Sequence, residues 1–431
     1  MSLSIIYIEK KIRETTEVKW FSSIMLICCM GYAVFKASYR ELGDIFQTIL
    51  FIGTLCALYV DRKNIIKDKI FVLLLISLTI PILSWINSLL YAQELATAKP
   101  KIAAIANFYF FFFIAYWLKG SIKHCHLFLI SFIFGVLLTF IFHSPDFIYD
   151  LKSGLIGNRI DFNYVNANHG AALLGCVILV AFFYIINIKS KEIIKSKISI
   201  VMCILILIFA ITLLVFTQSR QAWLATIMAI SFMSIVKLKV DNNIKVKVVI
   251  TSLFIVTLML AIISNIPIVS ERLSAEHYII PAILSWDINN VPYSSMGIRI
   301  HLWYESFSWI KNNPIFGLGG NTRAFVISTS STLPDYIKVS FSHLHNGFLG
   351  ILVNYGINGL LNFMLLFYFL IKSTISKKVP IYLSAYAIAF ILYFCIINLF
   401  ESFLLFKSGM YLFNCMSAVI YTFHLKQILE K

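Results

Sequence analysis

The sequence predicts an all-α integral membrane protein with about 12 transmembrane helices and a long, partly helical loop between the ninth and tenth helices. Of its 431 residues, 60% are hydrophobic and only 13% are charged. The apolar residues occur in runs of about 20, the length that crosses a bilayer as a helix. This composition excludes an ordinary soluble protein, and residues 1–431 are expected to form a single polytopic membrane domain.

The predicted spans follow one another along the chain, most of them with short connections. Six lie in the first half, at about 20–37, 43–60, 70–91, 102–118, 125–143 and 166–188. Six more follow at about 197–216, 221–236, 246–266, 346–371, 380–399 and 408–423. A helix satisfies its own backbone hydrogen bonds, so each of these runs can be placed in lipid.

Lysines predict how the chain is oriented in the membrane. Clusters rich in lysine occur in every second loop, and they include Arg62, Lys63, Lys67, Lys69, Lys189, Lys191, Lys195, Lys197, Lys237, Lys239, Lys245, Lys247, Lys372, Lys377 and Lys378. Because such charge collects in cytoplasmic loops, the N- and C-termini are predicted to be cytoplasmic. This distribution explains the net charge of +16 without a nucleic-acid partner.

Two loops on the outer side break the pattern of short connections. The first runs from about 144 to 165 and contains GNRIDF at 157–162. The second runs from about 267 to 345, and loops of this length are usually functional. Within it, apolar residues at helical spacing predict an amphipathic helix at about 297–311, followed by a glycine-rich turn at 317–320.

Four arginines, in contrast to the lysine clusters, occur on the outer side beside histidines and polar residues. They are Arg159, Arg220, Arg299 and Arg323. A guanidinium group offers a flat pair of donors that suits phosphate. Arg220 lies between two apolar helices with almost no loop, where a charge is costly unless it is paired or solvated. Arg220 is therefore a functional candidate or an interfacial anchor, and Arg299 a functional candidate or a solvated helix-face residue. The arginines predict a phosphate-bearing substrate.

The segment SHLHN, residues 342–346, comes immediately before a predicted span. Histidine titrates near neutrality, so His345 is a candidate general base, and His343 is the alternative. Either histidine could instead form hydrogen bonds at a helix start. A metal site is not predicted, because no HExxH motif occurs and no carboxylate or cysteine lies at metal-ligand spacing.

Two further polar residues lie near the ends of spans. Glu401, in a very short outer connection, is expected to orient a catalytic arginine or histidine or to bind a sugar hydroxyl. A plain interfacial carboxylate with a basic partner is an equal alternative. His169, beside Asn168 at the start of a span, is a weaker candidate. The eight cysteines lie in or beside spans without a CxxC pair, so neither a disulfide framework nor a thiolate zinc site is predicted.

Three stretches in this order resemble the bacterial O-antigen ligase and polymerase superfamily, and within it most of all the O-antigen ligases. They are TQSRQAWLA (217–225), GIRIHLWYESFSWIKNNPIFGLGGNTR (297–323) and HLHNGFLGILVNYGINGLL (343–361). The shared features are an arginine between two spans, a G-x-R that opens a loop helix, and an H-x-H-N that leads into a helix. The GNRIDF stretch resembles a ligase segment with an arginine in the first outer loop.

The resemblance implies a GT-C-like glycosyltransferase of the bacterial inner membrane that needs no cofactor or metal. Such an enzyme transfers a glycan from undecaprenyl diphosphate to the lipid A–core of lipopolysaccharide at the periplasmic face. By this resemblance Arg220 and Arg299 would hold the diphosphate, and His345 would activate the acceptor hydroxyl. The further candidates for substrate binding are Arg159, Arg323, His343, Asn346, Glu401 and His169. Direct displacement with one base predicts inversion at the anomeric carbon.

Three alternatives share parts of this pattern. An O-antigen polymerase performs the same reaction type with two polyprenyl-linked substrates. A protein O-glycosyltransferase shares the donor, but no additional periplasmic domain is evident to bind a peptide. A transporter of lipid-linked glycans would place ionisable groups at depth in the membrane, whereas here they cluster at one face.

Overall fold

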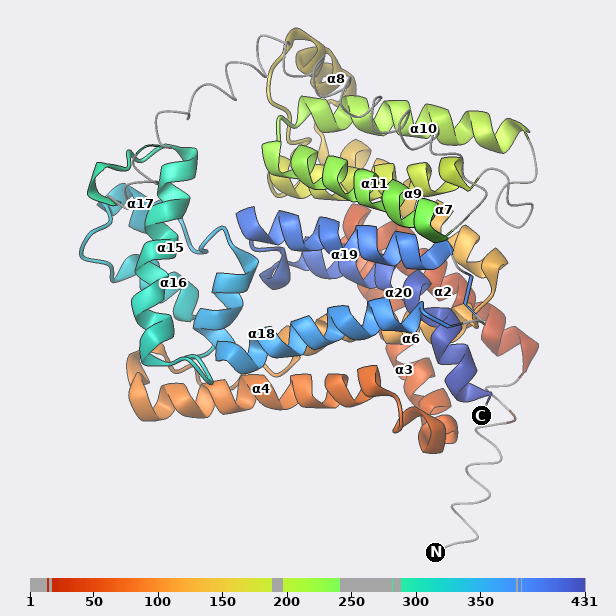
Figure 1. Cartoon of the computed structure of the whole chain (residues 1–431), viewed down its shortest axis with the longest axis horizontal. Coiled ribbons are helices and arrows are strands. Elements are labelled where there is room, and N and C mark those ends of the chain that lie inside the picture. Colours follow the sequence, from red (N-terminus) through yellow and green to blue (C-terminus); the bar gives the residue numbers. More distant parts are fainter. Residues whose placement is uncertain are drawn as a thin grey trace, which may run out of the picture.

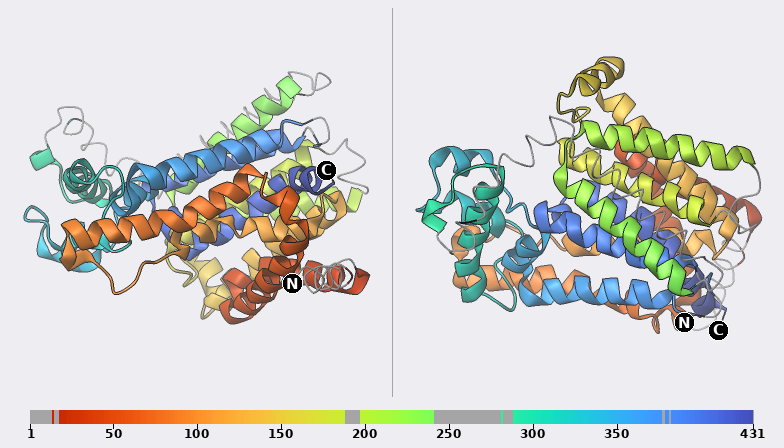
Figure 2. Two further views of the ribbon diagram at one scale, coloured as in Figure 1. Left: turned by 90° about the horizontal axis from the view of Figure 1, so that it is seen from below. Right: turned by 45° about the horizontal axis from the view of Figure 1, so that its top comes forward.

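The computed structural model describes residues 18–187, 197–240, 288–376, 379–380 and 382–430, together with Glu14 and Pro281. Within these residues all regular secondary structure is helical, and nine helices are long and apolar enough to cross a membrane. Most of these helices lie alongside one another in a bundle (Figures 1 and 2). The predicted all-α, multi-pass membrane protein is thereby confirmed.

The nine candidate spans each match a predicted one to within a few residues. They are α2 (Lys19–Ser38), α3 (Arg40–Ile65), α4 (Lys69–Tyr91), α7 (Ile122–His143), α9 (Ala167–Ile186), α10 (Lys197–Phe216), α11 (Arg220–Val240), α18 (Gly347–Ser373) and α19 (Tyr382–Phe400). The predicted span at 246–266 lies outside the described residues.

Two predicted spans take a different form. The run at 102–118 is divided into α5 (Ala103–Ala106), the 3-10 turn η2 (Asn107–Tyr109) and α6 (Phe111–Leu118). The run at 408–423 lies within α20 (Lys407–Leu429), a largely buried helix whose polar residues keep it out of the nine most apolar helices.

Asn414 of α20 explains how the chain tolerates the break before α6. Its Oδ1 accepts a hydrogen bond from the backbone N–H of Phe111 at 2.9 Å, and its Nδ2 donates to the carbonyl of Asn107 at 2.9 Å. Backbone groups that leave a helix inside a membrane need such internal partners.

The two outer loops contain helices of their own. The first loop forms α8 (Phe147–Ile156), which the sequence did not predict. The second contains the short turn η3 (Ile288–Asn290), then α15 (Ser295–Asn312), α16 (Thr322–Ser328) and α17 (Asp335–Ser340). The amphipathic helix predicted at 297–311 is confirmed as α15. Helices α15, α16 and α17 lie together at one end of the bundle, opposite the C-terminus (Figure 1). We call this end the loop end, and the opposite end the lysine-rich end.

The glycine-rich turn after α15 fits into a break in α18. Gly356 has φ 62° and ψ −164°, so the helix is interrupted there. The N–H of Ile357 donates instead to the carbonyl of Pro314 at 2.8 Å. A Cβ atom on Gly356 would lie 2.3 Å from the carbonyl oxygen of Ile315, so only glycine permits this approach. The contact fixes the long loop against the first half of α18. The short remaining 3-10 turns are η1 (Gln93–Leu95) and η4 (Phe403–Leu405).

Candidate active site

A buried carboxylate lies between two histidines at the loop end. Glu401 follows α19 directly, and its side chain has no exposed surface. Its Oε1 lies 3.0 Å from Nε2 of His343, and its Oε2 lies 3.3 Å from Nδ1 of His345. The centroids of the two imidazole rings are 4.1 Å apart. Both histidines predicted as candidate bases therefore share one carboxylate.

The charges of this cluster suit a base and its acidic partner. Burial by itself raises the pKa of Glu401, but the hydrogen bonds that its carboxylate accepts from His343 and His345 outweigh this effect, so the pKa lies well below its usual range. Burial lowers the pKa of His345; Glu401 opposes this decrease, and the charges of His343 and Arg299 add to it. At neutral pH Glu401 is therefore ionised and His345 is neutral.

The carboxylate also selects the tautomer of each ring. When Nδ1 of His345 donates to Glu401, Nε2 is left without a proton and can accept one. His343 faces the carboxylate through Nε2, so its Nδ1 would be the accepting atom. The arrangement is that of an acid that orients a catalytic histidine.

Several residues of the first outer loop and of the TQSR and SHLHN stretches have left-handed backbone conformations. His345 has a φ of 48°, Gln218 of 49°, and Val165 of 55°. Such values are uncommon outside glycine, and for a β-branched residue such as valine they are strained. Strain of this kind is often concentrated at functional sites. Val165 belongs to the first outer loop, Gln218 to the TQSR stretch and His345 to the SHLHN segment.

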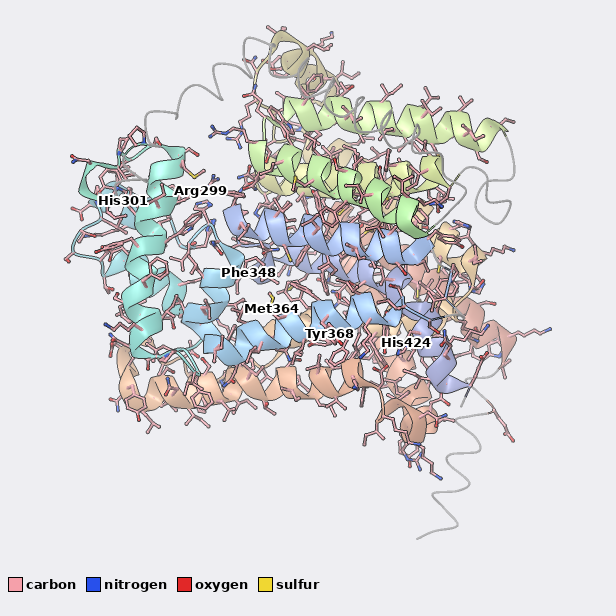
Figure 3. All side chains as sticks on the ribbon, in the orientation of Figure 1. Arg299, His301, Phe348, Met364, Tyr368 and His424 are labelled. Atoms are coloured by element: carbon pink, nitrogen blue, oxygen red, sulfur yellow. The ribbon has the colours of Figure 1, made fainter. Side chains whose placement is uncertain are left out.

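Helix α15 brings Arg299 toward the histidines. The indole Nε1 of Trp303 donates to the carbonyl of Leu344 at 2.9 Å, which fixes the helix against the histidine segment. Arg299 lies one turn earlier on the same face of α15. Figure 3 shows Arg299 on the side of the helix that faces the rest of the bundle. The positive charge of Arg299 contributes to lowering the pKa of His345.

A chain of hydrogen bonds connects Glu401 to Arg159. Nδ2 of Asn168 donates to Oε2 of Glu401 at 3.3 Å. Oδ1 of Asn168 accepts from Oγ of Ser219 at 2.9 Å and from Nη2 of Arg159 at 3.5 Å. The Nε of Arg159 donates to the carbonyl of Thr217 at 3.2 Å. The GNRIDF and TQSR stretches thus meet at the start of α9.

Arg220 is the first residue of α11, directly after Ser219. The preceding Gln218 donates from Nε2 to the carbonyl of Gly157 at 2.8 Å, which holds the turn against the first outer loop. Helix α11 therefore begins, at Arg220, next to the hydrogen bonds that Asn168 forms with Ser219 and Arg159.

Phe406 forms an aromatic wall behind the cluster, and nothing in the sequence indicated this role. Its ring meets His343 edge-on at 5.1 Å and His169 edge-on at 4.9 Å between centroids. Arg323 lies over the same ring, with its Cζ 5.8 Å from the centroid. His169 is buried, and its Nδ1 lies 2.5 Å from Oγ of Ser408. The wall brings Arg323 and His169 to the border of the site.

Asn346 caps α18. Its Oδ1 accepts hydrogen bonds from the backbone N–H groups of Phe348 and Leu349 at 3.0 and 3.1 Å. This contact orients the histidine segment at the helix start. Its predicted contact with substrate stays a prediction.

The same cluster has a ligand arrangement that could hold a metal ion, which the sequence spacing did not indicate. One ligand atom each from His343, His345 and Glu401 lies within 4.8 Å of the others. Two histidines and a glutamate are a known ligand set for catalytic zinc. The sequence spacing showed no carboxylate near the histidines, because Glu401 is 56 positions from His345 and reaches it only through the packing of α18 and α19. Every activity test should therefore include a chelator such as EDTA, to show whether the reaction needs a metal ion.

Part of the chain matches a known protein family. Residues 205–364 match the sequence model of the O-antigen ligases. This part of the chain is similar to the O-antigen ligase family. The match confirms the resemblance drawn from the three sequence stretches, and it contains Arg220, Arg299 and His345. Glu401 lies beyond it. A search of curated proteins finds no match.

The match of residues 205–364 to the O-antigen ligase family implies an O-antigen ligase or polymerase type of function. It also implies a glycosyltransferase-like membrane enzyme of lipopolysaccharide biosynthesis, with lipid-linked glycan and lipid A–core substrates in general. The nine apolar helices of the described residues agree with a multi-pass membrane protein.

Proposed function

We propose that this protein is an O-antigen ligase that transfers a glycan from undecaprenyl diphosphate to lipid A–core. The observation that carries the proposal is the pairing of a neutral His345 with an ionised Glu401, beside the charge of Arg299. A base and a cation at one site are what a glycosyl transfer from a diphosphate requires, because one activates the acceptor and the other stabilises the leaving group.

In the proposed reaction Nε2 of His345 takes the proton of an acceptor sugar hydroxyl. The hydroxyl oxygen forms a bond to the anomeric carbon of the donor glycan while the bond from that carbon to the diphosphate oxygen breaks. The undecaprenyl diphosphate leaves with the electron pair. Glu401 stabilises the imidazolium that forms. A single displacement of this kind inverts the anomeric carbon.

Arginines would stabilise the departing diphosphate. Its negative charge increases as the glycosidic bond breaks, so guanidinium groups placed there favour the transition state over the ground state. We assign this role to Arg299 and Arg220, with Arg159 beside them through Asn168. Arg323, over the Phe406 ring, is assigned to substrate binding at the border of the site. With this charge available, we propose that the reaction proceeds without a metal ion.

We further propose that the loop end faces the periplasm and that both termini lie in the cytoplasm. Lys67, Lys69, Lys372 and Lys426 all occur at the opposite end of the spans. Lysines retained on the cytoplasmic side explain this asymmetry. The polyprenyl and lipid A chains would then lie in the membrane next to the site.

Reconstitution tests the proposal. The purified protein is given an undecaprenyl-diphosphate-linked O-antigen and rough lipopolysaccharide in the presence of EDTA. A glycan ladder on lipid A–core is the expected result. Growth of the ladder on the undecaprenyl carrier would instead identify a polymerase. A requirement for added zinc would refute the metal-independent mechanism.

A further inference from the structure

A cavity lies at the lysine-rich end, far from the histidine cluster. It has a volume of about 350 Å³ and is formed by the α3–α4 connection, the end of α18 and the last turns of α20. Figure 3 shows Arg299 and His424 at opposite ends of the bundle, and His424 lines this cavity. The proposed glycan transfer makes no use of it.

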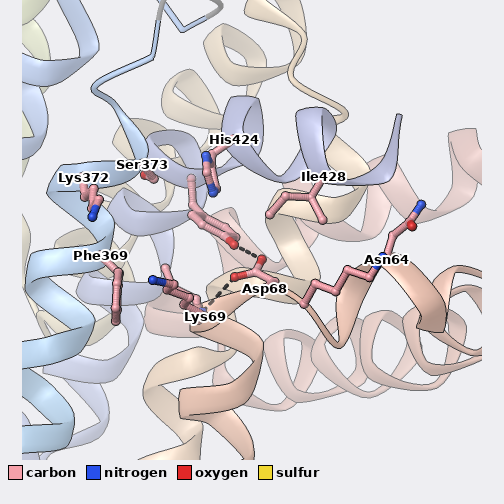
Figure 4. A pocket seen from close by; sticks show the side chains of 11 residues that line it. Asn64, Asp68, Lys69, Phe369, Lys372, Ser373, His424 and Ile428 are labelled. Carbon is pink, nitrogen blue, oxygen red and sulfur yellow. Dashed lines mark hydrogen bonds between the residues drawn. The ribbon is translucent and has the colours of Figure 1, made fainter. Parts of the chain in front are cut away.

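The lining of the cavity is basic. Lys67, Lys69 and Lys372 are exposed around it, and His424 beside them is half-buried. Lys69, Lys372 and His424 come from three helices, α4, α18 and α20 (Figure 4). Asp68 is the one carboxylate in the lining, and it is buried, with 3% of its surface exposed. Within the described lining the cations therefore outnumber the carboxylate.

Asp68 is already engaged by the protein. Its Oδ1 accepts a hydrogen bond from the N–H of Ile70 at 2.8 Å and caps α4, and its Oδ2 accepts from the hydroxyl of Tyr421. Burial also raises the pKa of Asp68. Both carboxylate oxygens of Asp68 are thus hydrogen-bonded to groups of α4 and α20. The exposed lysines around the cavity can therefore attract an anion.

Aromatic rings hold two of these lysines in position. The Nζ of Lys69 lies 5.4 Å from the centroid of Phe369, and the Nζ of Lys372 lies 5.3 Å from that of Tyr368. Lys372 also donates to the hydroxyl of Tyr368 at 3.2 Å. Contacts of this kind orient an ammonium group and leave its remaining donors for a ligand.

We propose that this cavity binds the phosphate headgroup of an anionic phospholipid. Basic pockets between transmembrane helices are suited to such headgroups. The shared chemistry, a phosphate, could also come from a soluble compound. The surroundings favour a lipid, because Val72 and Leu75 of α4 and Leu365 of α18 expose apolar side chains beside it, where acyl chains can lie.

Lipid retention in native mass spectrometry tests this proposal. The protein is released from vesicles of equal parts phosphatidylglycerol and phosphatidylcholine, which differ in net charge. The test variant is Lys69→Gln with Lys372→Gln. The matched control is Lys119→Gln with Lys426→Gln, which removes the same charge from a neighbouring cavity of about 330 Å³ that also contains Asp61 and Glu430.

We expect wild-type protein and the control to retain phosphatidylglycerol in preference to phosphatidylcholine. Each lysine near the membrane surface contributes to the attraction. The ratio of retained phosphatidylglycerol to phosphatidylcholine should therefore be roughly thirtyfold lower in the test variant than in wild-type protein. Equal retention of both lipids by wild-type protein would overturn the proposal, as would equal losses in the two variants.

A second measurement separates a lipid from a soluble phosphate. Inorganic phosphate at millimolar concentration is added to detergent-solubilised protein, and thermal unfolding is followed. Stabilisation that depends on Lys69 and Lys372, with no preference among lipids, would assign the cavity to a soluble anion and refute the lipid proposal. These readouts do not depend on glycan transfer, so failure of the proposed function leaves them intact.

Discussion

Glu401 and His345 are 56 positions apart in the sequence, yet Oε2 of the first lies 3.3 Å from Nδ1 of the second. The same carboxylate reaches His343 through its other oxygen and Asn168 through a side-chain amide. One buried group thus joins the start of α9, the segment before α18 and the connection between α19 and α20. The position and ionisation of the candidate base depend on this contact.

Replacing Glu401 by Gln should impair transfer more than folding. The amide keeps the shape but cannot stabilise an imidazolium, so we expect the transfer rate to fall by about 100-fold or more. The rate is measured in reconstituted vesicles. Asp335→Asn, an exposed carboxylate on α17, is the control and should leave the rate unchanged. Similar rates for Glu401→Gln and wild-type protein would refute the orienting role.

The wild-type rate should remain high below the usual pKa of histidine, about 6.5. Transfer requires neutral His345, and its pKa is lowered, so protonation abolishes activity only at more acidic pH. Because Glu401 raises this pKa, Glu401→Gln should shift the acidic limb to still lower pH. Profiles of transfer rate against pH for the two proteins test both statements. An acidic limb above 6.5 in wild-type protein would contradict the assignment.

Replacing Arg299 by Lys should abolish most transfer, although the charge is retained. A lysine is a point charge and does not reproduce the two parallel donors of a guanidinium group. We expect a loss of about 100-fold, and Arg62→Lys at the lysine-rich end serves as a control with no effect. An active Arg299→Lys enzyme would show that the paired donors are unnecessary.

Gly356→Ala should destabilise the protein through a specific collision. The new Cβ would lie 2.3 Å from the carbonyl oxygen of Ile315, in a residue with positive φ. Gly319→Ala is a matched control, since Gly319 also has a positive φ but its Cβ would find its nearest atom only at 3.8 Å. The control should cost about 1 kcal/mol and Gly356→Ala about 3 kcal/mol or more. Thermal unfolding in detergent compares them, and equal losses would exclude the steric argument.

Hydropathy predicted the spans well because bilayer thickness sets their length, independently of tertiary contacts. It predicted the region at 102–118 less well, because the break at Asn107–Tyr109 depends on Asn414, a residue about 300 positions away. The helix α8, within the first outer loop, was also not predicted.

The candidate site was only partly predictable for a similar reason. His343 and His345 could be recognised from their local pattern, and arginines beside spans from the cost of placing charge in a membrane. The contacts of Glu401 with both histidines could be recognised only from the three-dimensional structure. Phe406 gave no polar signal at all, and its role appeared only from its contacts with His343, His169 and Arg323.

The most direct test of the proposed mechanism is the transfer rate of His345→Ala with EDTA present. A second histidine variant, His301→Ala, is the matched control, because His301 lies on α15 and contacts the carbonyl of Val291 instead of Glu401. We predict that His345→Ala transfers glycan to lipid A–core about 1,000-fold more slowly than wild-type protein, while His301→Ala stays within a few-fold of it. Wild-type transfer rates in folded His345→Ala protein would contradict the assignment of His345 as the base.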